Sequence, residues 1–123
     1  MKTHALAVFH RPPANLNCAQ AVLAGYQAFT GDRSLPLVAF KPFGGGRAPD
    51  GLCGALHAAC RLAPARAEPL KANFLARVGA LRCADIEAPC VECVGTAAEL
   101  LQNSPPPPRL RPDSDSIPPA TPP

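Results

Sequence analysis

Residues 17–31 of the chain, NCAQAVLAGYQAFTG, contain the clearest indication of how it folds. Apolar side chains recur there every third or fourth position, and this spacing places them on one face of an α-helix. Asn15 or Asn17 can cap the start of the helix, and Gly31 follows its end. The stretch therefore predicts a helix over Asn17 to Phe29 with one buried face. That face consists of Cys18, Val22, Tyr26 and Phe29.

Two more helices are predicted in the middle of the chain. Asp50 is positioned to cap a helix that runs from Gly51 to about Leu62. Glu68-Pro69 suits the first turn of the next helix, and Gly79 suits its end. The apolar spacing gives each of them a buried stripe. For the second helix that stripe is Leu70, Phe74 and Val78.

Pro89 opens a last predicted helix, from Cys90 to Gln102. Between the first two helices, Leu37 to Phe40 is expected to form a short extended piece in a loop rich in Gly and Pro. No alternating apolar run is long enough to predict a sheet. The sequence therefore predicts an all-α fold, a small bundle of about four short helices. The last helix is expected to face inward with Val91, Val94, Ala98 and Leu101.

The proline content sets the expected domain boundary. Residues 104–123 hold nine of the 17 prolines, and proline lacks the backbone donor that helices and sheets need. Such a segment also has little apolar surface to bury. We therefore expect one helical, cysteine-rich redox or metal-binding domain over residues 1–103 and a disordered Pro-rich tail over residues 104–123.

Charge and hydropathy exclude several classes of protein. The formal net charge is only +3, the basic residues are scattered, and the chain has no Trp and one Tyr, so we expect no nucleic-acid partner. No apolar stretch reaches the roughly 20 residues of a membrane span. Met1 to Arg11 lacks the cleavage site of a signal peptide, which favours a cytoplasmic location.

Six cysteines in 123 residues are far more than ordinary usage. Without a signal sequence, thiols that hold a metal or cycle through a disulfide are favoured over a structural disulfide framework. Cys18, Cys53 and Cys90 fall in predicted first turns, where unpaired amides and the helix dipole stabilise a thiolate. We therefore expect Cys53 and Cys90 to ionise at a lower pH than a free thiol.

Two local groupings of cysteine add to this expectation. Cys90 and Cys93 form a Cys-x-x-Cys motif at a helix start, which suits a dithiol that attacks and resolves, half of a zinc site, or half of an iron–sulfur site. Cys53, His57 and Cys60 share one predicted helix face. They could bind a soft metal, or His57 could serve as a base, but we favour the interpretation in which His57 is a surface or hydrogen-bonded histidine and Cys60 belongs to the core.

Three blocks of the sequence resemble one known family. They are Asn17 to Leu23, Phe43 to Gly46 and Gly51 to Ala55, and they are similar to the redox-active proteins named for the cysteine pattern C_GCAxxG_C_C. The resemblance covers about residues 15–102. Ala58 stands where that family has the second glycine of its Cys-Gly-Ala-x-x-Gly element.

The resemblance implies a bacterial protein with four cysteines in one redox site, and it makes Cys60 and Cys93 additions to the pattern. It also implies a redox or transport partner protein, because members are often encoded near transporter genes. An iron–sulfur cluster is a further implication, because a related cysteine module accompanies such clusters. The four cysteines are Cys18, Cys53, Cys83 and Cys90.

These observations predict a redox-active thiol protein. It would bind an iron–sulfur cluster or another soft metal, with Cys93 as a further ligand beside the four signature cysteines, or it would cycle a disulfide. The alternative is a non-catalytic interaction domain in which a zinc ion supports the fold.

Overall fold

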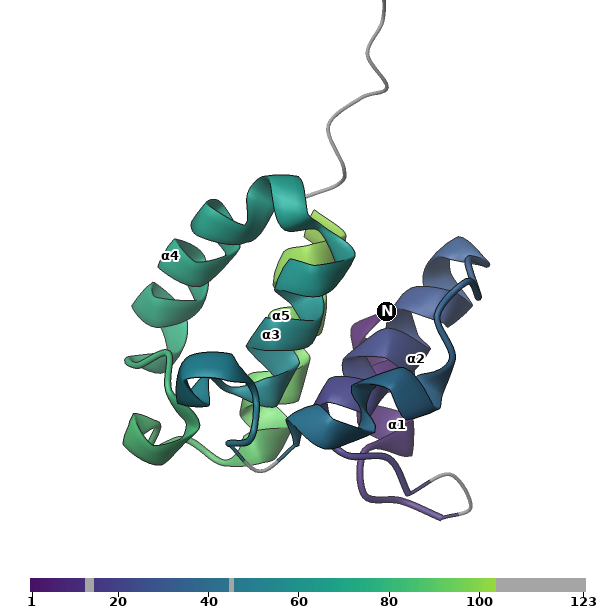
Figure 1. Cartoon of the computed structure of the whole chain (residues 1–123), viewed down its shortest axis with the longest axis horizontal. Coiled ribbons are helices and arrows are strands. Elements are labelled where there is room, and N and C mark those ends of the chain that lie inside the picture. The colour runs from purple at the N-terminus through teal and green to yellow at the C-terminus, as the bar shows by residue number, and fades with distance from the viewer. Residues whose placement is uncertain (13–14, 45, 104–123) are drawn as a thin grey trace, which may run out of the picture.

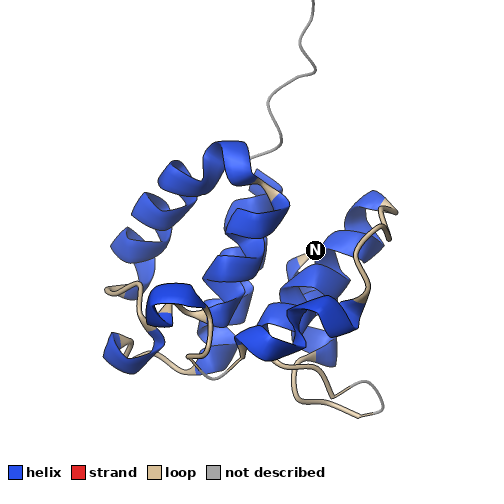
Figure 2. Ribbon diagram, in the orientation of Figure 1, coloured by secondary structure: helices blue, strands red, loops and turns tan. Residues whose placement is uncertain are grey.

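The computed structural model describes residues 1–12, 15–44 and 46–103. These residues form five α-helices and four short 3₁₀ helices and contain no strand (Figures 1 and 2). The predicted all-α fold is therefore confirmed, although the helices outnumber the four expected. In chain order they are α1 (Lys2–Val8), α2 (Cys18–Thr30), η1 (Leu37–Phe43), η2 (Pro49–Gly51), α3 (Gly54–Leu62), η3 (Pro64–Arg66), α4 (Ala67–Val78), η4 (Cys83–Asp85) and α5 (Cys90–Asn103).

Helix α2 has the local signals that its sequence predicts. The Asn17 side chain accepts a hydrogen bond from the Gln20 amide at 2.8 Å, and the Gln20 side chain accepts one from the Asn17 amide at 3.2 Å. This reciprocal pair satisfies two amides that the start of a helix leaves unpaired. Gly31 ends the helix in the left-handed conformation, with φ of 78°. Both predicted ends of α2 are thus confirmed.

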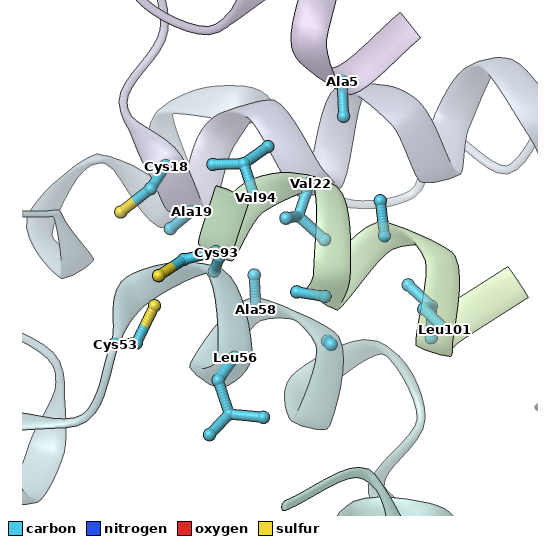
Figure 3. Packing of buried hydrophobic residues seen from close by; sticks show 14 of the residues in the cluster. Ala5, Cys18, Ala19, Val22, Cys53, Leu56, Ala58, Cys93, Val94 and Leu101 are labelled. Carbon is cyan, nitrogen blue, oxygen red and sulfur yellow. The ribbon is translucent and has the colours of Figure 1, made fainter. Parts of the chain in front are cut away.

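The helices enclose a core built largely from small side chains. Helices α3 and α5 lie side by side, α4 packs against both, and α1 and α2 cover the other side (Figure 1). Figure 3 shows Val22, Ala58 and Val94 at the centre of this core. Ala58, the residue at the family's glycine position, is fully buried. Small core side chains such as Ala58 let α2, α3 and α5 pack closely against one another. The starts of these three helices therefore lie close together.

The start of α3 differs from the prediction. Asp50 does not cap this helix, because it lies in η2 with φ of 62°, outside the helical region. Helix α3 begins at Gly54, and Cys53 is its N-cap residue. The extended piece expected at Leu37–Phe40 is also wrong, because these residues belong to the 3₁₀ helix η1. Cys53 therefore precedes the first turn instead of lying inside it.

Three further findings depart from the sequence prediction. Helix α1 was not predicted, and only Ala5 of its seven residues is buried. Phe29 and Val91, both expected to face inward, are 55% and 46% exposed. The expected tail at residues 104–123 lies outside the described residues. Within the part that is described, no helix combines the length and apolar character needed to cross a bilayer.

Candidate thiol site

Five of the six cysteines surround one small cavity, which we call the thiol cavity. It has a volume of about 70 Å³ and lies where the starts of α2, α3 and α5 meet. Figure 3 shows the sulfur atoms of three of these cysteines, from three different helices, at the same edge of the core. The cavity is lined by Cys18, Cys53, Gly54, Cys83, Ile86, Ala88, Cys90 and Cys93.

Cys18 reaches the cavity because α2 begins at this residue. The Asn17 cap fixes that start, and the Asn17 side chain also donates to the Lys41 carbonyl at 2.9 Å. Cys18 is 8% exposed. A Cβ added to Gly54 would lie 2.7 Å from the Cys18 sulfur and would overlap the Phe43 carbonyl oxygen. Only glycine fits at residue 54, so the Cys-Gly sequence allows α2 and α3 to meet at their starts.

Cys53 and Cys83 are brought together by a short backbone pairing. Leu52 and Arg82 form an isolated antiparallel bridge, and the Cys53 amide donates to the Leu81 carbonyl at 2.9 Å. This pairing holds the η4 turn, which begins at Cys83, beside the start of α3. Cys53 is buried and Cys83 is partly exposed. The bridge therefore explains how residues 30 positions apart line one cavity.

Cys90 and Cys93 enter the cavity from the first turn of α5. The Pro89 carbonyl accepts hydrogen bonds from the Glu92 and Cys93 amides, at 2.9 and 3.3 Å, which confirms that the helix starts beside Pro89. The two thiols differ in access. Cys90 is exposed, whereas Cys93 is only 3% exposed. The Cys-x-x-Cys motif thus has one thiol, Cys90, open to solvent and one, Cys93, in the core.

Cys53 and Cys93 form a hydrogen-bonded thiol pair between α3 and α5. The Cys53 thiol donates to the Cys93 sulfur, and this bond lowers the pKa of Cys93 below its ordinary value. The same bond, together with burial, raises the pKa of Cys53 far above its ordinary range. The Cys53 thiol thus favours the ionised form of Cys93, and Cys53 itself is the thiol that keeps its proton.

The pKa directions correct the expectation for Cys53 and Cys90. Burial, and then repulsion from the nearby Cys83 and Cys53 sulfurs, raises the pKa of Cys90 despite its place at the start of α5. The amides of Ala55 and Leu56 do act to lower the pKa of Cys53, as a helix start should, but the bond to Cys93 and burial outweigh them. Neither thiol is therefore expected to ionise early.

Cys60 and His57 lie away from the thiol cavity. The Cys60 thiol donates to the Ala67 carbonyl at 3.8 Å, between α3 and α4. The His57 ring packs edge-on against Phe43, with ring centres 4.5 Å apart. Burial and the charges of Arg61 and Lys71 lower the pKa of His57. The predicted grouping of Cys53, His57 and Cys60 on one face of a helix does not form, because Cys53 precedes α3.

The donor side chains of the described residues do not converge on a metal centre. Among the described residues, no three side chains of His, Cys, Asp or Glu form a group that could hold a metal ion as they are arranged. No disulfide joins any of the six cysteines, all of which are described. The arrangement is thus a set of thiols around a small cavity, with one hydrogen-bonded pair inside it and one thiol at its exposed edge.

Sequence reasoning placed five of these cysteines in the site but did not single out Gly54, which makes room for Cys18. Gly46 makes room for Cys83, since a Cβ there would lie 3.4 Å from Cys83 Cβ, and its φ of 81° is a conformation that side chains rarely adopt. The signal that could have identified Gly54 is its position directly after Cys53, in the first turn of a predicted helix.

Comparisons with family models, with curated proteins and with solved structures found no match to this chain. The resemblance to the C_GCAxxG_C_C family therefore stays a prediction that depends on the residues quoted above.

Proposed function

We propose that the protein is a dithiol redox protein that exchanges thiols with disulfides of a partner molecule. The observation that carries this proposal is the different placement of the two Cys-x-x-Cys thiols. Cys90 is exposed at the edge of the thiol cavity, and Cys93 is buried inside it beside the Cys53 donor. An accessible thiol and a stabilised thiolate one helical turn apart suit attack and resolution.

The first step takes place at Cys90. Its sulfur, as the thiolate, attacks one sulfur of a partner disulfide, forming a Cys90–partner disulfide and breaking the partner's own S–S bond. The second partner sulfur leaves as a thiolate and takes up a proton from solvent. Because the pKa of Cys90 is raised, only a small fraction is ionised at neutral pH, so this step should be faster in alkali.

The second step takes place at Cys93. Its thiolate attacks the Cys90 sulfur, forming a Cys90–Cys93 disulfide and releasing the partner as a reduced thiolate, which is then protonated. Two electrons pass from the dithiol to the partner disulfide. The Cys53 hydrogen bond favours this step because it keeps Cys93 ionised. Cys53 is therefore a positioning residue, which acts through Cys93.

Trapping the mixed disulfide tests this order of steps. Oxidised glutathione serves as the disulfide probe, followed by mass spectrometry and free-thiol counting. In the wild-type protein, glutathione should be released and two thiols lost together. In Cys93→Ser, one glutathione should remain attached to Cys90. Cys60→Ser is the matched control, because Cys60 lies outside the thiol cavity, and it should behave as the wild type does.

Two outcomes would contradict the proposal. In the first, Cys90→Ser loses thiols as readily as the wild type, which would move the attacking thiol elsewhere in the chain. In the second, peptide mapping shows a disulfide that excludes both Cys90 and Cys93.

The same five cysteines that line the thiol cavity favour a second candidate function, soft-metal or iron–sulfur binding, since thiolates are the preferred ligands of such centres.

Metal analysis separates the two candidates. As described, the side chains form no group that could hold a metal, so binding would require several sulfurs to turn toward a common centre. We therefore expect protein purified without oxygen to contain no stoichiometric iron or zinc. Stoichiometric iron with visible absorbance would favour the cluster, and stoichiometric zinc without colour would favour the structural site.

A further inference from the structure

A second pocket lies where α2, α3 and α5 end, and we call it the Arg66 pocket. Its volume is about 330 Å³, near the lower end of what small-ligand sites in proteins enclose. Its walls are mostly apolar, and Phe29, although 55% exposed, forms part of them. Its lining residues include Met1, Tyr26, Phe29, Leu62, Leu101 and Arg66.

Arg66 places an unsatisfied cation at this pocket. Its Nε and Nη1 atoms are buried, and within the described residues neither has a hydrogen-bond partner. Buried donors without partners are rare in proteins, and a guanidinium carries five of them in a planar fork that matches a carboxylate. Burial lowers the pKa of the Arg66 guanidinium.

We propose that the Arg66 pocket binds a small apolar carboxylate, whose chain lies against Phe29, Leu62 and Leu101 and whose carboxylate accepts hydrogen bonds from Arg66. This proposal is independent of the thiol chemistry, because the two sites share no lining residue. The apolar walls supply affinity, and the guanidinium supplies the preference for an acid.

The surrounding backbone makes this preference depend on a cation at the pocket. The pocket lies at the ends of α2, α3 and α5, where the helix dipoles place partial negative charge. An anion is disfavoured there unless a cation offsets that charge. Arg66 immediately precedes α4 and is its N-cap residue, so it brings its charge to this point in the fold. Without the guanidinium, the cation left among the described lining residues is the Met1 ammonium, which already donates to Gln102 Oε1 at 3.1 Å, so the preference for an acid should be lost.

Octanoate and octan-1-ol are the probes for this proposal, because they share an apolar chain and differ in the head group. Isothermal titration calorimetry on the full chain should show octanoate binding about tenfold more tightly than the alcohol, a difference of one charge-assisted contact. In Arg66→Gln the alcohol should bind as tightly as octanoate or more tightly. Arg77→Gln is the control, since Arg77 is a surface cation paired with Glu99 outside this pocket.

A second variant tests the location of the ligand. Ala65 lines the Arg66 pocket and is exposed, so Ala65→Leu should fill the pocket without disturbing the core. It should weaken both probes by more than tenfold. Equal binding of the two probes to the wild type, binding of neither probe, or unchanged binding in Ala65→Leu would each overturn the proposal. A preference for octanoate that survives in Arg66→Gln would overturn it as well.

Discussion

The two ends of the same three helices have opposite chemistry. The starts of α2, α3 and α5 gather sulfur atoms around a small cavity of about 70 Å³, whereas their ends form an apolar pocket of about 330 Å³ with one guanidinium. Helix α5 has 14 residues, so it separates the two sites by about 20 Å. The dipoles of three helices that start together act in favour of an anion at one end, although burial outweighs them at Cys53 and Cys90, and they disfavour an anion at the other end unless a cation is present.

The two ends also differ in how tightly they are built. At the thiol end, Cys18, Cys53 and Cys93 belong to the buried core, and Gly54 leaves no room for a methyl group. At the other end, Phe29 is largely exposed. A change at the thiol end should therefore affect the stability of the whole fold, and a change at the Arg66 pocket should affect mainly what that pocket binds.

The largest effect is expected from Gly54→Ala. The added methyl group would meet the Phe43 carbonyl and the Cys18 sulfur, so α2 and α3 would have to move apart. We expect a loss of about 3 kcal/mol in the free energy of unfolding, measured by urea denaturation. Gly95→Ala is the matched control in α5, because its methyl group meets the flexible end of Lys2 at 3.1 Å and makes ordinary contact with Leu6 at 3.7 Å.

Gly95→Ala should be neutral or should raise stability by up to about 1 kcal/mol, since alanine is the better helix former. If Gly54→Ala and Gly95→Ala reduce the free energy of unfolding by the same amount, close packing is not confined to the thiol end. In that case the contrast between a tight end and an open end would not hold.

Much of the helical framework could be predicted because its signals are local. The Asn17 cap, the glycines after α2 and α4, and Pro89 before α5 each act within a few residues of the helix end that they define. Helix α1 has no side-chain cap, so no such signal predicts it; it is held by packing against α2 and α5. The start of α3 depends on the bridge between Leu52 and Arg82, which the local sequence does not reveal.

The residues of the candidate site also divide into those that local signals indicate and those that depend on contacts between distant segments. Helix starts indicate Cys18 and Cys90 from the sequence, whereas Cys83 lies in the 3₁₀ turn η4 and was named only by the family resemblance. The ionised thiol could not be predicted. It depends on a contact between Cys53 and Cys93, which belong to different helices, and this contact outweighs the local effect of each helix start.

The second prediction tests that contact. In Cys53→Ala the hydrogen bond to Cys93 is lost, so the pKa of Cys93 should move upward. Ultraviolet absorbance of thiolates, followed across a pH titration, should show one early ionisation in the wild type that moves to higher pH in this variant. Cys60→Ala should retain the early step, because Cys60 bonds to the Ala67 carbonyl instead. An early step that persists in Cys53→Ala would assign the thiolate to another residue.

The third prediction concerns stability against pH. The folded-state pKa values of Cys53, Cys60 and Cys90 are raised, so the folded protein holds these protons more tightly than the unfolded chain does. Their contribution to stability is complete below the unfolded thiol pKa of about 8.5 and is lost as pH rises further. The pKa of Cys93 is lowered, so its contribution has the opposite sign and is lost as pH falls.

We expect the free energy of unfolding to decrease above about pH 8.5, as measured by urea denaturation at a series of pH values. Cys53→Ala should flatten this decrease, because Cys53 has the largest upward shift of the raised thiols. A stability that rises between neutral and alkaline pH would show that the lowered pKa of Cys93 dominates the thiol end.

The smallest effect is expected from Arg66→Met at the open end. The buried Nε and Nη1 atoms have lost water without gaining a partner in the described residues, which costs stability in the absence of a ligand. Methionine keeps much of the apolar contact with the pocket walls and removes the unsatisfied charge. We expect the variant to be more stable than the wild type by about 0.5 to 1 kcal/mol in urea denaturation.

Octanoate should stabilise the wild type but not this variant, because a ligand that binds only the folded state raises its stability. A variant less stable than the wild type would mean that the guanidinium contributes to the fold, and the proposed division between a tightly packed thiol end and an open, ligand-binding end would fail.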